Sequence, residues 1–111
     1  EPADHMLWQG LPVEGAPQAR HSPWFGLYYV VDSGYVYHED HGWLFLPAMP
    51  GNPGYYFDLA MGAWAFTDPT VYPFLFAFRE SPGWAYFLGR DGDRRSFFDL
   101  GSGTLFTLPR G

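Results

Sequence analysis

Cysteine and lysine are both missing from this chain of 111 residues. Without cysteine, no disulfide can brace the fold, and thiol usage gives no information on the redox compartment. Without lysine, neither isopeptide cross-links nor Schiff-base chemistry through a lysine amine is available. Any assembly that the chain forms is therefore expected to be non-covalent.

Positive charge and long apolar runs are scarce as well. The net charge of −6 provides no basic face for phosphates, so we expect no nucleic-acid partner. No run of about 18 apolar residues occurs, so we expect no membrane span. The chain begins at Glu1-Pro2 rather than at methionine, so we expect a processed mature chain or a fragment, and we favour removal of a secretory signal. These features favour an extracellular location, either secreted or at the cell surface.

Aromatic residues are abundant, with 11 Phe, 8 Tyr and 5 Trp, and they are interspersed with 14 Gly and 11 Pro. Glycine and proline at this density interrupt any long helix, and the length is typical of one domain. The composition therefore predicts a single all-β domain without a helical core.

Four glycines, Gly42, Gly62, Gly83 and Gly103, stand about 20 residues apart, each between two aromatic segments. The four units are YVYHEDHGWLFL at 35–46, YYFDLAMGAWAF at 55–66, FAFRESPGWAYF at 76–87 and SFFDLGSGTLFT at 96–107. The polar residues four positions before the glycines are His38, Asp58, Arg79 and Asp99. Polar turn entrances and glycine exits are typical of hairpins, and such units must stack on one another to bury their apolar faces.

The pattern predicts about nine short strands in an antiparallel meander, in which sequential strands are neighbours. Residues 23–111 form this β-hairpin repeat domain. Residues 1–22 do not share the repeat, and we predict that they form an extended N-terminal arm, held by its own domain or by a neighbouring copy. The strands do not alternate apolar and polar residues as a sheet with one wet face should. We therefore expect part of the aromatic surface to contact another molecule.

The segments YVYHEDHGWLFL and VYPFLF carry a resemblance. Residues 22–108 resemble an aromatic-rich repeat region near the C-termini of many secreted bacterial surface proteins, with the patterns YxYHxxHGWL, GWxWT and YPxLY. The resemblance implies an extracellular or cell-surface module and brings no activity. The chain departs from the pattern at Ala63, Ala65 and Leu105.

A looser similarity links the units to choline- and glucan-binding hairpin repeats, which build ligand cages from aromatic residues of successive hairpins. That similarity implies a candidate interface or ligand face composed of Trp43, Tyr56, Trp64, Trp84 and Tyr86. Counted from the glycines, Trp64 is one position out of phase with Trp43 and Trp84.

Residues suited to catalysis or metal binding form no convincing set. The HEDH segment from His38 to His41 offers two imidazoles, but a structural zinc requires four ligands, so we interpret it as a solvated turn. Asp91-Gly92-Asp93 is shorter than a calcium loop. No serine follows a nucleophile-elbow pattern. Asp58 and Asp99, the candidate carboxylates for glycoside cleavage, are interpreted as turn formers. We therefore predict no enzyme, no metal site and no cofactor.

The function expected from these observations is that of a structural subunit of an extracellular filament or surface assembly. Strand edges that lack lysine and charge are templates for strand addition, and a head-to-tail contact that does not close gives a filament. In this hypothesis the arm contacts the hairpin faces of the next copy through Met6, Leu7, Trp8, Leu11 and Val13. The partner is then a homo-oligomer or polymer. The alternative is a carbohydrate- or cell-wall-binding β-repeat module, whose partners are glycans.

Overall fold

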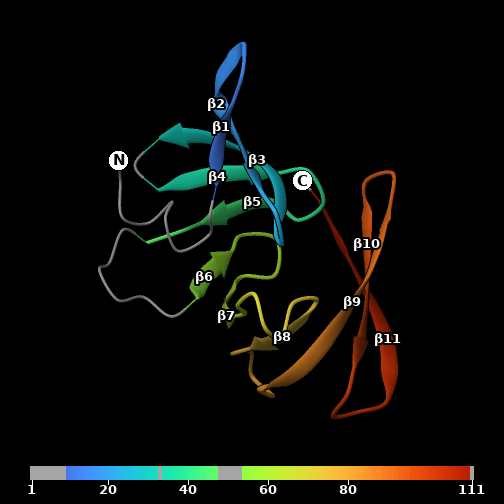
Figure 1. Ribbon diagram of the computed structural model, residues 1–111. Helices are drawn as coiled ribbons and strands as arrows, with labels where there is room; N and C mark the ends of the chain where they lie inside the picture. Colours follow the sequence, from blue (N-terminus) through green and yellow to red (C-terminus); the bar gives the residue numbers. More distant parts are fainter. Residues whose placement is uncertain (1–9, 33, 48–53, 111) are drawn as a thin grey trace.

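The computed structural model describes residues 10–32, 34–47 and 54–110, and these form one antiparallel sheet of eleven strands in which every strand lies beside its neighbours in sequence (Figure 1). The strands are β1 (Leu11–Val13), β2 (Ala16–Ser22), β3 (Gly26–Asp32), β4 (Tyr35–His38), β5 (Gly42–Phe45), β6 (Tyr55–Asp58), β7 (Ala63–Phe66), β8 (Phe74–Ala77), β9 (Gly83–Asp91), β10 (Arg94–Asp99) and β11 (Thr104–Pro109). Across these residues there is no helix that is long and apolar enough to cross a membrane. The predicted all-β antiparallel meander is confirmed.

Two strands beyond the expected number of about nine come from the segment that we predicted as an arm. Residues 11–22 form β1 and β2, and β2 pairs with β3 through Arg20 and Tyr28. Prolines within this segment hide its strand character in the sequence, because they disrupt the alternating pattern. Pro12 lies on the edge strand β1, and Pro17 lies in the part of β2 that precedes its pairing with β3, and both positions tolerate proline. Leu11 and Val13 thus belong to the edge strand of their own sheet, whereas Met6, Leu7 and Trp8 lie outside the described residues.

Side-chain size, rather than polarity, alternates along β4 to β8. One face is buried and carries mostly small or aliphatic residues, among them Leu44, Ala65 and Ala77. Every position on the other face holds Tyr, Phe or Trp and is partly exposed. Because successive side chains of a strand point to opposite faces, this sequence divides the sheet into a small-residue inner face and an aromatic outer face.

The sheet curls toward its inner face. In Figure 1, β3 to β8 follow one another down the view, while β9 to β11 lie on the right and run steeply. A bulge at Leu88, where Phe97 pairs with Phe87 and Ser96 with Gly89, bends β9 at this point. The C-terminal end of the curl reaches the β4–β5 turn so closely that a Cβ on Gly42 would lie 1.7 Å from the carbonyl oxygen of Arg110. Gly42 also has a φ of 79°, so only glycine fits there.

A buried ion pair spans the interior of the curl between β6 and β10. Arg95 on β10 donates from Nη1 to Asp58 Oδ2 at 2.7 Å and from Nη2 to Asp58 Oδ1 at 3.1 Å. Both side chains are almost fully excluded from solvent. In a flat sheet β6 and β10 would lie about 19 Å apart, at about 4.8 Å per strand, so this contact requires the curl. The bidentate geometry offsets the cost of removing both charges from water.

Asp58→Asn is expected to destabilise the fold strongly. The asparagine side chain keeps an oxygen that can accept the Met61 N–H, which Asp58 Oδ1 accepts at 3.0 Å, but it leaves the Arg95 charge buried without its anion. We expect a loss of about 3 to 5 kcal/mol in the free energy of unfolding, measured by urea denaturation.

Asp99→Asn is the matched control, since Asp99 ends β10 and accepts the N–H of Gly101 at 2.9 Å in the same way. Its ion pair with Arg79 is partly exposed and 3.5 Å long, so a loss below about 1 kcal/mol is expected. Equal losses in the two variants would contradict a special role for the buried pair.

Candidate interaction surface

Each of three hairpins places the same aromatic pair on the outer face. Tyr37 opposes Trp43, Phe57 opposes Trp64 and Phe76 opposes Trp84. Their ring centroids are 5.1, 5.5 and 5.3 Å apart, and their planes cross at 73°, 74° and 79°. Edge-to-face packing of this kind is the favoured arrangement of aromatic pairs and stabilises antiparallel strand pairs. A second set of directly opposed pairs consists of Tyr35 with Phe45, Tyr55 with Phe66, and Phe74 with Tyr86.

Pairing from strand to strand connects these residues into rows that cross four strands each. Two rows have the order Tyr, Phe, Phe, Trp, and they are Tyr35–Phe45–Phe57–Trp64 and Tyr55–Phe66–Phe76–Trp84. A third row is Phe74–Tyr86–Phe98–Leu105. Each row begins one hairpin after the previous one. We call the surface formed by these rows, together with Tyr37 and Trp43, the outer aromatic face.

The outer aromatic face is unusually apolar for a surface. Trp64 exposes 42% of its area and Tyr35 exposes 44%. Within the described strands β4 to β8, every outward-facing position is aromatic, so no charged side chain stands on this face. Monomeric proteins rarely expose contiguous apolar patches larger than a few hundred Å². The surface is therefore suited to bind another molecule.

Four of the five aromatic residues proposed from the sequence lie on this face, namely Trp43, Trp64, Trp84 and Tyr86. Tyr56, which the sequence groups with them, lies instead on the inner face and is fully buried, because it directly follows the outward-facing Tyr55. Trp64 is in phase with the other tryptophans once strand ends are counted instead of glycines. The turn after Asp58 contains one residue more than the turn after His38.

Sequence reasoning missed most of the aromatic residues that complete the rows. Among them are Tyr35, Phe45, Tyr55, Phe57, Phe66 and Phe74. The signal that could have identified them was the alternation of large and small side chains, which hydrophobicity alone does not show.

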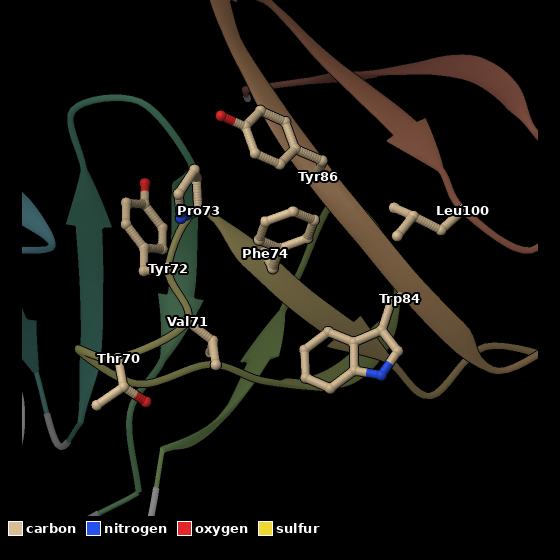
Figure 2. A pocket seen from close by; sticks show the side chains of 8 residues that line it. All are labelled: Thr70, Val71, Tyr72, Pro73, Phe74, Trp84, Tyr86 and Leu100. Atoms are coloured by element: carbon tan, nitrogen blue, oxygen red, sulfur yellow. The ribbon is translucent and has the colours of Figure 1, made fainter.

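Two hollows indent the outer aromatic face. The first has a volume of about 520 Å³ and is lined by Tyr35, Phe45, Phe57, Leu59 and Trp64. The second has a volume of about 550 Å³ and is lined by Trp84, Tyr86, Leu100 and residues 70–74. Figure 2 shows the ring of Phe74 between those of Trp84 and Tyr86, with Leu100 on one side and Thr70 to Tyr72 on the other.

The wall of the second hollow is held by the core. The N–H groups of Val71 and Tyr72 both donate to the carbonyl oxygen of Asp68, at 3.1 and 3.0 Å. Tyr72 then reaches His41, whose Nε2 lies 2.9 Å from the tyrosine hydroxyl. Burial raises the pKa of Tyr72, so this hydroxyl keeps its proton. The loop is therefore a fixed wall of the hollow.

The HEDH segment is not the solvated turn that we expected from its sequence, since His38 and His41 are fully buried. His38 Nε2 donates to the carbonyl of Phe25 at 2.6 Å, and its Nδ1 accepts the N–H groups of Asp40 at 3.0 Å and His41 at 3.1 Å. These bonds define a neutral imidazole. His38 thus receives turn amides as Asp58 and Asp99 do in later hairpins.

Burial is the main reason that both histidines stay neutral. It lowers the pKa of His38 from 6.5 to about 4, against the opposing influence of the Phe25 carbonyl and Asp40. Burial, followed by the proximity of His38 and Arg95, lowers the pKa of His41 well below 6.5. In the part of the chain that the structure describes, no group of three His, Cys, Asp or Glu residues is arranged to hold a metal ion.

Comparisons with models of protein families, with curated proteins and with solved structures gave no match. The function is therefore inferred from the geometry and chemistry of the outer aromatic face.

The buried histidines predict acid destabilisation above the range in which carboxylates titrate. The unfolded chain binds a proton at each histidine near pH 6.5, whereas folded His38 does so only near pH 4. The contribution of each buried histidine to the free energy of unfolding is thus fully present above pH 6.5. It is lost as the pH falls toward 4, by up to about 1.4 kcal/mol per pH unit for each histidine. Urea denaturation at a series of pH values measures this slope.

His38→Asn is the informative variant for this prediction. The asparagine oxygen can replace Nδ1 as acceptor for the turn amides, but it does not titrate. We expect a lower stability at pH 7.5 and a shallower decline between pH 6.5 and 4, because only His41 of the buried pair remains. An unchanged slope would show that the acid sensitivity originates elsewhere.

Proposed function

We propose that this chain is a structural subunit of a non-covalent extracellular filament or surface layer, in which copies bind one another through the outer aromatic face. The observation that carries the proposal is the uninterrupted aromatic character of that face over β4 to β8. Aromatic residues are enriched in the cores of protein interfaces, and each can bury about 150 to 250 Å². A second copy supplies a surface of matching chemistry.

The two edges of the sheet support an open-ended polymer. In the described part of the chain, β1 and β11 each pair with a single strand. Both are apolar and exposed, since Leu11 on β1 exposes 68% and Leu105 on β11 exposes 67% of its area. Lysine and charge normally protect such edges, and β11 has neither. Because the two edges differ, pairing between them is a head-to-tail contact, which extends into a filament unless it closes a ring.

The extracellular location in this proposal rests on the resemblance of residues 22–108 to repeat regions of secreted bacterial surface proteins. A lysine-free, cysteine-free subunit also depends on apolar contacts and main-chain pairing for its cohesion. No catalytic role is included in the proposal.

A carbohydrate-binding module is the second candidate, and the second hollow favours it because Trp84 and Tyr86 offer ring faces there. Sugars also require polar partners in their binding sites. Two of the hydroxyls in that lining are already engaged, since Thr70 Oγ1 donates to Asp68 Oδ1 at 2.6 Å and Tyr72 Oη is bonded to His41. A glycan would therefore lose the hydrogen bonds between its hydroxyls and water and would gain few hydrogen bonds from the protein. We therefore favour a protein partner.

Trp64→Glu is expected to abolish assembly while leaving the fold intact. Trp64 lies on the outer aromatic face and is 42% exposed, so a carboxylate is tolerated in the free subunit but must lose its water in the assembled state. Polymer mass is measured by sedimentation and filaments by negative-stain microscopy. Ser81→Glu, in an exposed turn, adds the same charge away from the face and should assemble normally. Normal filaments from Trp64→Glu would refute the proposed interface.

Assembly is also expected to withstand salt and chelators. Each subunit carries −6, so copies repel one another, and about 1 M salt reduces the Debye length to about 3 Å. Apolar burial is not screened, and polymer mass should therefore stay constant or rise with salt. Dissolution by salt would mean that arginine–carboxylate pairs hold the subunits together. Dissolution by a chelator would instead reveal a metal ion between them.

A further inference from the structure

The two hollows occupy equivalent positions in the repeat. Tyr35 and Phe45 oppose each other in the first, as Phe74 and Tyr86 do in the second. The residue that follows the strand-end aspartate is leucine in both, and its N–H donates to the carbonyl of a tryptophan in the preceding hairpin. Leu59 donates to Trp43 at 3.2 Å and Leu100 to Trp84 at 3.0 Å.

The hairpin between them shows what fills such a hollow. Phe78 occupies the same position as the two leucines, because its N–H donates to the carbonyl of Trp64 at 2.9 Å. Its ring lies 5.9 Å from that of Tyr55 and 5.0 Å from that of Phe76. An aromatic side chain at this position therefore packs into the space that leucine leaves open in the other two units. The hollows are sites shaped for one more aromatic ring.

We propose that the second hollow is the acceptor for the apolar segment Met6-Leu7-Trp8 of a second copy, with the Trp8 indole as the inserted ring. This inference rests on the proposed function and names the site through which the subunits join. The lining of Phe74, Trp84, Tyr86 and Leu100 is dominated by ring faces and aliphatic carbon, and it suits an indole better than a polar group.

The position of the hollow in the sheet selects a second copy as the donor. The segment precedes β1, the first strand of the sheet, whereas the second hollow is lined by residues of β8 and β9 and by Leu100 after β10. Trp8 stands two residues before Gly10, so at about 3.3 Å per residue it stays within roughly 7 Å of Gly10, which directly precedes β1. A neighbouring copy packed against that edge is the subunit whose hollow it reaches. Because donor and acceptor are different surfaces of the subunit, their pairing gives the head-to-tail contact that a filament requires.

The fixed loop distinguishes the second hollow from the first. Residues 70–73 add a wall that the first hollow lacks, and this wall is held through Tyr72 and His41. A walled site encloses an inserted ring on more sides and so removes more of its surface from water. The second hollow is therefore the specific site, and the first serves as its internal comparison.

Leu100→Phe tests the inference by filling the second hollow in the way that Phe78 fills the middle unit. Leu100 exposes 46% of its area, so the larger side chain is compatible with the fold, which thermal melting verifies. We expect assembly to require a subunit concentration higher by about 30-fold or more, the loss typical of a principal aromatic contact. Leu59→Phe makes the same change in the first hollow and should leave assembly unaltered. Normal assembly of Leu100→Phe, or an equal loss in Leu59→Phe, would overturn the assignment.

Mixing two variants tests donor and acceptor separately. A chain with Leu7→Ser and Trp8→Ser keeps an open hollow but loses the donor, while Leu100→Phe keeps the donor but loses the hollow. At a concentration where the wild type assembles but Leu100→Phe does not, each variant alone should stay monomeric. Together they should form a one-to-one dimer in analytical ultracentrifugation, since each supplies what the other lacks. The absence of that dimer would refute the pairing.

The same reagents separate this inference from the proposed function. Wild-type chains that remain monomeric would overturn both. If the wild type forms polymers and the Leu7→Ser, Trp8→Ser variant forms the same polymers, only the acceptor site is overturned. Assembly through the aromatic face then stays in place. As an independent measurement, a labelled peptide of residues 1–13 should bind the full-length Leu7→Ser, Trp8→Ser chain and should bind about 30-fold more weakly once Leu100→Phe is added.

Discussion

Small side chains on one face of β4 to β8 set the shape of the whole molecule, because they allow the sheet to curl until its distant strands meet. Ala65 and Ala77 occupy little space inside the curl, and Gly42 lets the chain at Arg110 approach to within contact of the first hairpin. Of the Tyr, Phe and Trp residues on β4 to β8, Tyr56 alone lies on that side. The others lie on the outer face, where rings can spread and pack edge to face. The exposed aromatic surface is thus a consequence of the curl.

The polar groups in the core follow from the same constraint. A lining of alanine leaves space in the interior, and the long side chain of Arg95 extends through it to reach Asp58. A buried pair of this kind is costly to separate, so it favours one degree of curl over others. His38 and His41 occupy the same interior as neutral groups, and the Arg95 charge further opposes protonation of His41. The outer aromatic face therefore keeps its geometry only while this polar interior stays intact.

The sequence predicted the all-β antiparallel meander, because glycine spacing and turn chemistry are local signals. It did not separate the two faces. In the run Tyr55, Tyr56, Phe57, hydrophobicity is uniform, and only the small residues opposite them reveal which ring is buried. Ala63 and Ala65, which depart from the GWxWT pattern, are the residues that the inner face requires. The role of the HEDH turn was hidden as well, since burial of His38 depends on Phe25, which is remote in the sequence.

One position in the repeat explains how, in the proposed assembly, an array of nearly identical hairpins can present a single site. Phe78 fills its own hollow, whereas Leu59 and Leu100 leave theirs open. The 70–73 loop then walls only the second hollow. If every hairpin offered the same hollow, a neighbouring subunit could bind at several offsets along the face, and the contact would have no fixed register. Because one hollow is filled and another has an additional wall, the three hairpins no longer offer equal binding positions. Specific interfaces commonly disfavour the wrong positions in this way. For the proposed polymer, one defined contact then rests on a difference of ring size at a single repeated position.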